Sequence, residues 1–351
     1  MNINIVFPYN TWSGAHRSTY ELSNRMAARG HDVKIYFPFF PYRNRANPVS
    51  VEGISTVGRG LIRSSVRRNR VPWFELNVPV KVIPTITNRF VRDADVILAN
   101  HWQTAESVAR LAPSKGRKFN FVRDHSEDER IIRSLRLPLR QIVSIPWLKD
   151  CLEREIGVDV CGIVANGLNM DEFGVEEKRH NDPPVLTMCY NPGDPRKGVE
   201  DGLAALERIK AKYPQVEIHL FGWRQPPDLG LDAKFHHRPV KDRLRAVYAG
   251  TDIFLAPSRA EGYHNPPREA MAAQCAVVAT NVGSIPHCAI PGKTAIVVEP
   301  RDVDAMVEGI SRLIENTDER REMGANAYQH IKQFDWEESA SELLRVFEAS
   351  T

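Results

Sequence analysis

The sequence lacks the features that mark a membrane-spanning, secreted or metal-binding chain. No apolar run approaches the roughly 20 residues that a membrane-spanning helix needs. The start, Met1 to Tyr9, has neither the basic stretch nor the cleavage site of a signal peptide. The five cysteines form no CxxC pair and have no metal-ligand spacing, so we interpret them as reduced thiols. We therefore expect a cytoplasmic protein that binds no metal.

Acidic residues are scarce in one part of a chain whose net charge is only +3. Residues 1–180 contain 27 Lys and Arg against 19 Asp and Glu, whereas residues 181–351 contain 20 against 25. The basic excess is concentrated in residues 41–70, where Glu52 is the single acid. Two interpretations stay open: a solvated loop, or a peripheral contact with an anionic acceptor or with the inner face of a membrane. Nucleic-acid binding is not expected, because recognised nucleic-acid motifs and interleaved aromatic residues are missing.

Short apolar runs alternate with segments of helical periodicity along the whole chain. Helices are expected at 18–29, 197–213, 241–248, 266–274 and 336–349, between strand-like runs such as INIVFPY, ADVILAN, VLTMCYN and DIFLAPS. A chain of 351 residues is too long for one ordinary core, and the Pro- and charge-rich passage 176–184 separates two such series. The pattern predicts an α/β protein with two doubly wound parallel sheets.

Glycine-rich phosphate loops are also absent, because the chain contains no GxGxxG. A single glycine, Gly14, follows the first strand and precedes a helix, which suits either an ordinary turn or a close approach to a phosphate. In NPGDPRKG (191–198), Arg196 and Lys197 are expected in the first turn of a helix. Cations are unfavourable there unless an anion lies nearby, so this stretch is either a phosphate site or a solvated turn.

Two glutamates flank a loop-to-helix junction in SRAEGYHNPPREAM (258–271). Asn265 is a suitable N-cap, and the two prolines after it suit the first helical positions. Backbone N–H groups of residues 262–265 are then expected to face an anion. Glu261 and Glu269 would accept hydroxyl hydrogen bonds on either side of it, which indicates a nucleotide-sugar. The alternative is an exposed turn with incidental charges.

The stretch YAGTDIFLAPSRAEGYHNPPREAMAAQCAVVATNVGSIP resembles the C-terminal signature of the retaining glycosyltransferases of family 4, with their Glu-x7-Glu motif. SGAHRSTYELSNRMAARGHDVKIY, DADVILANHWQTA and VANGLNMDEF resemble the family's N-terminal segments, so the resemblance covers nearly the whole chain. It implies a GT-B fold, with two Rossmann-like domains facing an interdomain cleft. Residues 1–175 would form the acceptor-side domain, 176–335 the nucleotide-sugar donor domain, and 336–351 a helix crossing back to the N-terminal domain.

The resemblance also implies roles for individual residues. His101, Lys197 and Glu261 would form the catalytic group, with Glu261 at the sugar hydroxyls, Lys197 at the diphosphate and His101 near the reacting carbon. The implied donor-binding residues are Gly14, Arg196, Tyr263, His264, Asn265 and Glu269. The donor would be a nucleoside-diphosphate sugar, the acceptor a glycan, a lipid-linked sugar or a small molecule, and no cofactor or metal would be needed. Transfer would occur on one face of the sugar, with the leaving phosphate deprotonating the acceptor.

The chain departs from the family pattern at three places. Pro192 stands where many relatives carry an arginine, and Arg196 is expected to substitute for it. Tyr263-His264 replaces a usual Phe-Gly, and GSIPH (283–287) replaces Gly-Gly-x-Pro-Glu, which predicts an altered sugar pocket.

Three further interpretations stay open at this level. Asp124 and His125, in VRDHSED, are candidates for acceptor binding. The chain could instead be a nucleotide-sugar epimerase of GT-B fold, which would need acid and base carboxylates around the sugar ring. It could also be a non-catalytic subunit that binds a nucleotide-sugar.

Overall fold

The computed structural model describes residues 1–11, 13–39, 71, 74–123 and 128–349. The arginine-rich segment 41–70, Asp124 and His125 lie outside these described residues. The chain divides into two compact units, Met1–Gly167 with Trp336–Thr351, and Leu168–Asp335. Sequence composition placed this boundary after residue 175. The residues just after Gly167 belong to the second unit because they pack into its core, where Phe173 meets Tyr248 edge-on.

The first unit is built on a seven-stranded sheet in the order β3-β2-β1-β4-β5-β6-β7, and every neighbouring pair is parallel. The strands are β1 (Asn2–Val6), β2 (Asp32–Pro38), β3 (Val80–Ile83), β4 (Val96–Asn100), β5 (Arg117–Val122), β6 (Arg140–Val143) and β7 (Val160–Ile163). Among the described residues its helices are α1 (Gly14–Ala28), α3 (Trp102–Ala109), α4 (Glu129–Leu135), α5 (Pro146–Cys151) and α13 (Trp336–Ala349), with short turns η1 (Pro113–Lys115) and η2 (Leu152–Ile156).

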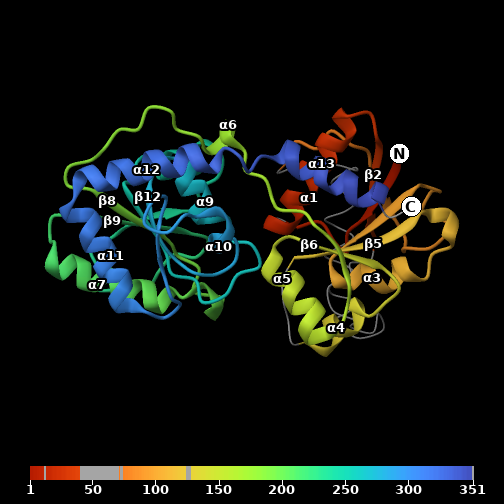
Figure 1. Cartoon of the computed structure of the whole chain (residues 1–351), viewed down its shortest axis with the longest axis horizontal. Coiled ribbons are helices and arrows are strands. Elements are labelled where there is room, and N and C mark those ends of the chain that lie inside the picture. The colour runs from red at the N-terminus through yellow and green to blue at the C-terminus, as the bar shows by residue number, and fades with distance from the viewer. Residues whose placement is uncertain (12, 40–70, 72–73, 124–127, 350–351) are drawn as a thin grey trace. The chain divides into compact units, whose positions relative to one another are not determined.

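Alternate strand residues of the first unit enter two separate cores. Ile3 and Ile5 of β1 pack under α1 and α13, whereas Val6 packs in the core covered by α3. Helices therefore cover both faces of the sheet, as Figure 1 shows. Helix α13 is last in the chain but belongs to this unit, where its Phe347 contacts Phe119 of β5 at a ring-centroid distance of 4.9 Å.

The second unit repeats this plan with six parallel strands in the order β10-β9-β8-β11-β12-β13. The strands are β8 (Val185–Cys189), β9 (Glu217–Gly222), β10 (Lys234–His237), β11 (Ile253–Ala256), β12 (Ala276–Thr280) and β13 (Ile296–Val298). The helices are α6 (Met170–Phe173), α7 (Val199–Lys212), α8 (Asp242–Ala249), α9 (Asn265–Ala272), α10 (Ile285–Cys288), α11 (Val303–Glu315) and α12 (Thr317–Ile331), with the short turn η3 (Pro195–Lys197).

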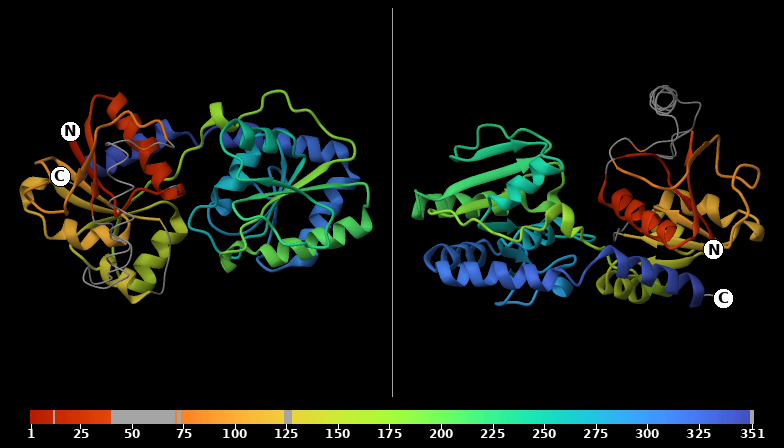
Figure 2. Two further views of the ribbon diagram at one scale, coloured as in Figure 1. Left: turned by 180° about the vertical axis from the view of Figure 1, so that it is seen from behind. Right: turned by 90° about the horizontal axis from the view of Figure 1, so that it is seen from above.

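The helices of the second unit also lie on both faces of its sheet (Figure 2). Ile253 and Leu255 of β11 face the core under α7 and α11, and Phe254 and Ala256 face the core under α9 and α12. The predicted architecture of two doubly wound parallel sheets is confirmed. No helix in the described part of the chain is long and apolar enough to cross a membrane.

Candidate functional site

Each sheet has a central point at which the strand order reverses. In open parallel sheets, ligands bind beyond the carboxyl ends of the strands at this point. In the second unit the reversal lies between β8 and β11, and the loops after these two strands carry Lys197 and Glu261. In the first unit it lies between β1 and β4, which are followed by Gly14 and His101. The topology therefore brings the predicted residues to one such edge in each unit.

Lys197 and Glu261 form an ion pair at the edge of the second sheet. The Lys197 Nζ lies 2.8 Å from both carboxylate oxygens of Glu261, and the Ser258 hydroxyl donates to Oε1 at 2.9 Å. Burial disfavours the charged carboxylate, but His264, the Lys197 ammonium group and the Ser258 hydroxyl together hold the pKa of Glu261 below its ordinary value. A negatively charged acceptor of hydrogen bonds and a cation thus lie side by side.

The backbone around Lys197 differs from the expected helix. Arg196 and Lys197 lie in η3 rather than in the first turn of α7, because Gly198 has a left-handed φ of 58° and separates the two. A Cβ at Gly198 would come within 2.0 Å of the Pro257 carbonyl oxygen, so the loop after β11 packs directly on this turn. The close contact fixes the position of Lys197 opposite the loop that carries Glu261.

Arg196, which was expected to contact a phosphate, is held by a neighbouring carboxylate. Its guanidinium forms a two-pronged contact with Asp194, with Nη2 2.9 Å from Oδ2, and its side chain is half exposed. Sequence reasoning missed Arg259, which binds both carboxylate oxygens of Asp201 on α7 at 2.7 Å. This pair fastens the loop after β11 to the helix that follows Lys197.

Helix α9 begins one residue earlier than predicted, at Asn265 instead of Pro266. Asn265 is its first residue rather than its cap, and the cap position belongs to His264, which has a left-handed φ of 72°. Pro266 and Pro267 follow Asn265 within the first turn of the helix, and they contribute no backbone N–H to an anion. The Tyr263 ring lies 4.8 Å from the buried Arg268 guanidinium, so it packs on the helix.

Glu269 lies on the next turn of α9 and is held by a tyrosine. The fully buried Tyr248 hydroxyl donates to Glu269 Oε2 at 2.8 Å, and burial, with the Glu269 charge, raises the Tyr248 pKa well above its ordinary value. Cys189 ends β8 near this region, and its pKa is raised to about 12 by burial, in the field of Lys197 and the two glutamates. Sequence spacing did not single out this thiol, which lines the same edge of the sheet.

The first unit collects aromatic and histidine rings at its own edge. His101 directly follows β4 with a φ of 87°. The centroid of its ring lies 5.1 Å from that of the His16 ring and 6.3 Å from that of the Tyr9 ring. Burial lowers the pKa of His101 to about 3, so the ring is neutral at ordinary pH. Gly14 is the first residue of α1 rather than a loop residue, because Ser13 caps this helix by accepting from the His16 N–H at 3.3 Å.

A partly buried arginine at the same edge was missed by the sequence analysis. The Arg123 guanidinium donates to the hydroxyls of Ser18 and Thr19 and to the Asn166 side chain at 2.6 to 3.1 Å, and it lies 3.8 Å from the centre of the Phe121 ring. These hydrogen-bond partners are neutral, and burial lowers the pKa of Arg123 to about 9. An arginine directly after an apolar strand, as in FNFVR, is the sequence signal that could have found it.

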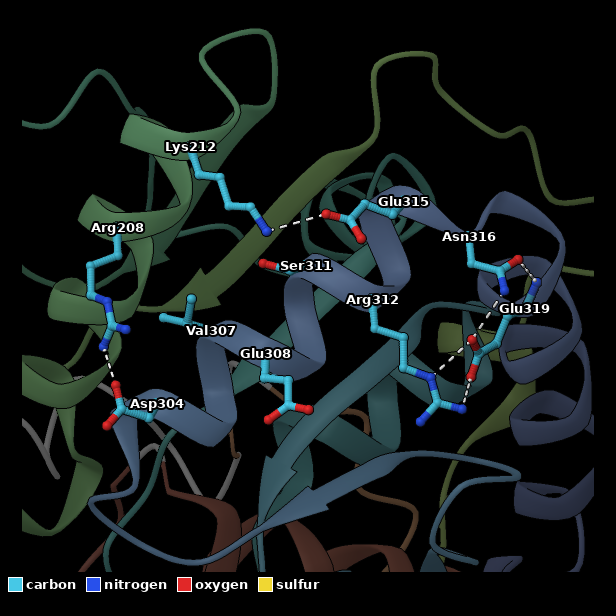
Figure 3. A pocket seen from close by; sticks show the side chains of 10 residues that line it. All are labelled: Arg208, Lys212, Asp304, Val307, Glu308, Ser311, Arg312, Glu315, Asn316 and Glu319. Atoms are coloured by element: carbon cyan, nitrogen blue, oxygen red, sulfur yellow. Dashed lines mark hydrogen bonds and ion pairs between the residues drawn. The ribbon is translucent and has the colours of Figure 1, made fainter.

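A charged groove on the second unit lies away from these loops. It is formed by α7, α11 and the start of α12, and its volume is about 710 Å³ (Figure 3). Its three cations pair with carboxylates: Arg208 with Asp304 at 2.7 Å, Lys212 with Glu315 at 3.2 Å and Arg312 with Glu319 at 2.6 Å. Because each of these cations faces a carboxylate, we interpret the groove as a surface ion-pair network.

Comparison with known proteins identifies the part of the chain that carries the ion pair. Residues 183–316 match the family described as glycosyl transferases group 1. This stretch includes Lys197, Glu261 and Glu269. Because of this match, we refer to residues 183–316 as the group 1 domain.

Relatives of this group 1 domain extend over different shares of the chain. The phosphatidyl-myo-inositol mannosyltransferase of Mycolicibacterium smegmatis is 29% identical over 99% of this chain and 94% of its own length. The MMP alpha-(1->4)-mannosyltransferase of Mycolicibacterium hassiacum is 30% identical over 44% of this chain. For some of these relatives the chain matches less than half of their own length. The match covers 40% of the M. hassiacum enzyme and 48% of Mycobacterium tuberculosis glycogen synthase.

Several solved structures share the fold of this chain over nearly its whole length. Sucrose-phosphate synthase from Thermosynechococcus elongatus has a TM-score of 0.74 at 18% identity and covers 100% of both chains. Anabaena HepE in complex with UDP and glucose has a TM-score of 0.73 at 15% identity, with 99% of this chain covered. The fold is therefore GT-B, as the resemblance implied.

Proposed function

We propose that this chain is a retaining glycosyltransferase that moves a sugar from a nucleoside-diphosphate sugar to a hydroxyl acceptor. The observation that carries the proposal is the Lys197–Glu261 pair at the strand-order reversal of the group 1 domain. A cation suits a diphosphate, and a partly buried carboxylate suits sugar hydroxyls. The relatives are named as mannosyl- and other glycosyltransferases, and HepE has been crystallised with UDP-glucose.

The proposed reaction breaks the bond between the anomeric carbon and the diphosphate oxygen and forms one to the acceptor oxygen. The electron pair of the broken bond stays on the nucleoside diphosphate, whose growing negative charge Lys197 would stabilise. The acceptor proton passes to the leaving phosphate oxygen on the same face of the sugar, so no side chain of the protein needs to act as base. Glu261 would hold the sugar hydroxyls and Glu269 the ribose. His101, neutral because of its burial, would contact the donor sugar.

On the acceptor side, we propose that Arg123 receives an anionic group. Several relatives are named for phosphorylated acceptors, among them the phosphatidyl-myo-inositol mannosyltransferase and the D-inositol 3-phosphate glycosyltransferase of Corynebacterium efficiens. A buried guanidinium held by neutral hydroxyl and amide groups keeps its charge available to a phosphate. Replacing Arg123 with Gln should raise the KM for a phosphorylated polyol acceptor and leave donor hydrolysis unchanged. An equal effect on both would contradict this assignment.

Residues 41–70 add a proposed peripheral contact with an anionic membrane, since their arginines would be attracted to acidic lipids. Sedimentation with vesicles of phosphatidylserine and phosphatidylcholine tests this. Binding that depends on phosphatidylserine and falls with salt supports the contact, whereas equal binding to phosphatidylcholine alone contradicts it.

Product analysis with a panel of UDP- and GDP-hexoses tests the activity and separates the alternatives. A transferase releases free nucleoside diphosphate and yields a glycosylated acceptor. An epimerase returns an isomerised, intact donor, and a binding subunit is stabilised against heat without turnover. Lys197→Ala and Glu261→Ala should both abolish most transfer, and transfer that survives both substitutions would contradict the site.

A further inference from the structure

His264 is a buried imidazole at the first turn of α9, beside the Lys197–Glu261 pair. Only 6% of the residue is exposed, and its left-handed φ of 72° is one that glycine adopts without cost. Nε2 lies 3.3 Å from the Ser258 hydroxyl and 3.8 Å from Glu261 Oε1. The second distance is too long for a hydrogen bond, so Ser258 connects the histidine to the carboxylate.

The direction of these hydrogen bonds fixes the tautomer of His264. The Ser258 hydroxyl has one hydrogen, which it donates to Glu261 Oε1 at 2.9 Å. Its oxygen must therefore accept from the imidazole, which places the ring hydrogen on Nε2. Burial lowers the pKa of His264 to about 4, so the ring is neutral at ordinary pH and carries this one hydrogen alone. Nδ1 then carries a lone pair and no hydrogen, so it can only accept a hydrogen bond.

Nδ1 of His264 is buried and has no hydrogen-bond partner among the described residues. A buried acceptor without a donor is costly, and native structures rarely keep one without a reason. Resting on the proposed function, we propose that His264 Nδ1 accepts a hydrogen bond from a hydroxyl of the transferred sugar and so selects donors that carry a free hydroxyl at that position. The sugar class it favours is an unsubstituted hexose, and a deoxy or acylated sugar at that position would be disfavoured.

The neighbouring loop keeps the imidazole in this position. The Ser284 N–H donates to the Tyr263 carbonyl at 2.8 Å, and a Cβ at Gly283 would lie 3.1 Å from the Cβ of His264 and 2.9 Å from that of Glu261. The GSIPH segment therefore packs on the turn that carries His264. Both departures from the family pattern in this region thus belong to one arrangement around the same sugar-binding carboxylate.

The test compares wild-type protein with His264→Gly and His264→Asn. Glycine removes the acceptor and tolerates the left-handed φ, and asparagine tolerates it while offering an amide oxygen near the position of Nδ1. Each protein is assayed with the hexose donor that the wild type uses and with the series of its analogues in which one hydroxyl is replaced by fluorine. Fluorine cannot donate a hydrogen bond, so it removes the interaction from the ligand side. Binding of the free nucleoside diphosphate is measured in parallel.

We expect one fluoro analogue to lower kcat/KM of the wild type by about tenfold more than it lowers that of His264→Gly. His264→Asn should recover part of this discrimination, and all three proteins should bind the free nucleoside diphosphate equally. Equal sensitivity of wild type and His264→Gly to every analogue would overturn the inference while leaving the proposed transfer intact. A loss of nucleoside-diphosphate binding in His264→Gly would also overturn it, because the role would then be structural. If the wild type neither transfers nor binds any donor, the proposed function fails as well.

Discussion

The ammonium nitrogen of Lys197 is 2.8 Å from both carboxylate oxygens of Glu261, although 64 positions of sequence separate the two residues. Their side chains are 30% and 10% exposed, so the pair is shielded from solvent mainly on the glutamate side. A donor that binds here would place its diphosphate near a cation already neutralised by Glu261. Sugar hydroxyls would have to share the carboxylate with that cation, which couples the binding of the two halves of the donor.

Replacing Lys197 with Met should lower kcat/KM for the nucleotide-sugar donor by roughly 100-fold or more, since a cation aimed at developing charge contributes about that much. Steady-state kinetics with a fixed acceptor measures the loss. Arg208→Met is the matched control, because Arg208 pairs with Asp304 on the remote groove and both side chains are well exposed. Equal losses in the two variants would remove Lys197 from the proposed mechanism.

Gly198→Ala should destabilise the second unit and weaken donor binding together. The new Cβ would come within 2.0 Å of the Pro257 carbonyl, so the turn that carries Lys197 must move away from the loop that carries Glu261. Gly157→Ala provides the control, because Gly157 has a similar left-handed φ of 71° but nothing within 4 Å of the added Cβ. We expect a cost of about 1 kcal/mol from the backbone alone at Gly157 and clearly more at Gly198, read by thermal unfolding.

Arg259→Ala should reduce stability by about 1 kcal/mol, because its two-pronged contact with Asp201 joins the loop after β11 to α7. The same substitution should raise KM for the donor more than it lowers kcat, since it loosens the loop without removing a group that contacts the reacting atoms. Denaturant unfolding and initial rates measure the two effects. A fall in kcat at unchanged KM would indicate a more direct role.

Phe347→Ala should cost about 3–5 kcal/mol in the first unit, because Phe347 is fully buried and its ring contacts Phe119 of β5. Arg345→Ala on the same helix should change stability by less than about 0.5 kcal/mol, since its ion pairs are exposed. Hydrogen exchange of β5 amides reports the loss locally. Comparable effects of the two substitutions would mean that α13 is not packed as described.

Acid should destabilise the protein from about pH 6.5 downward. Burial lowers the pKa values of His16 and His264 to about 4, whereas an exposed histidine of the unfolded chain titrates near 6.5. Between these values the unfolded state binds more protons, so the stability that is present above pH 6.5 is lost as the pH falls toward 4. Each residue contributes at most about 1.4 kcal/mol per pH unit in this window. Melting temperatures of His264→Gly should fall less steeply with pH than those of the wild type, and parallel curves would contradict the burial effect.

The local sequence was sufficient to predict the alternation of strands and helices and to recognise the Glu-x7-Glu block. Apolar runs such as ADVILAN could only be buried strands, and the segment 336–349 was expected to be a helix over the bounds that α13 has. Helix ends were less accurate, because caps depend on single residues. α1 begins at Gly14 rather than near Ser18 since Ser13 accepts from the His16 N–H. In α7, Gly198 delays the start and leaves Lys197 in a separate turn.

Periodicity and motifs are properties of residues that are close in sequence. They were enough to predict the fold class and to select the candidate site residues. The pairing of those residues depends on contacts between distant parts of the chain, and only the tertiary structure decided it. The folded chain forms ion pairs between Lys197 and Glu261, between Arg259 and Asp201, and between Arg196 and Asp194. It also surrounds the Arg123 guanidinium with Ser18, Thr19 and Asn166, and it buries His264. No local sequence pattern relates the strands and loops that do this. Charge and tautomer follow from such surroundings, so the chemistry of the site is a property of the folded chain.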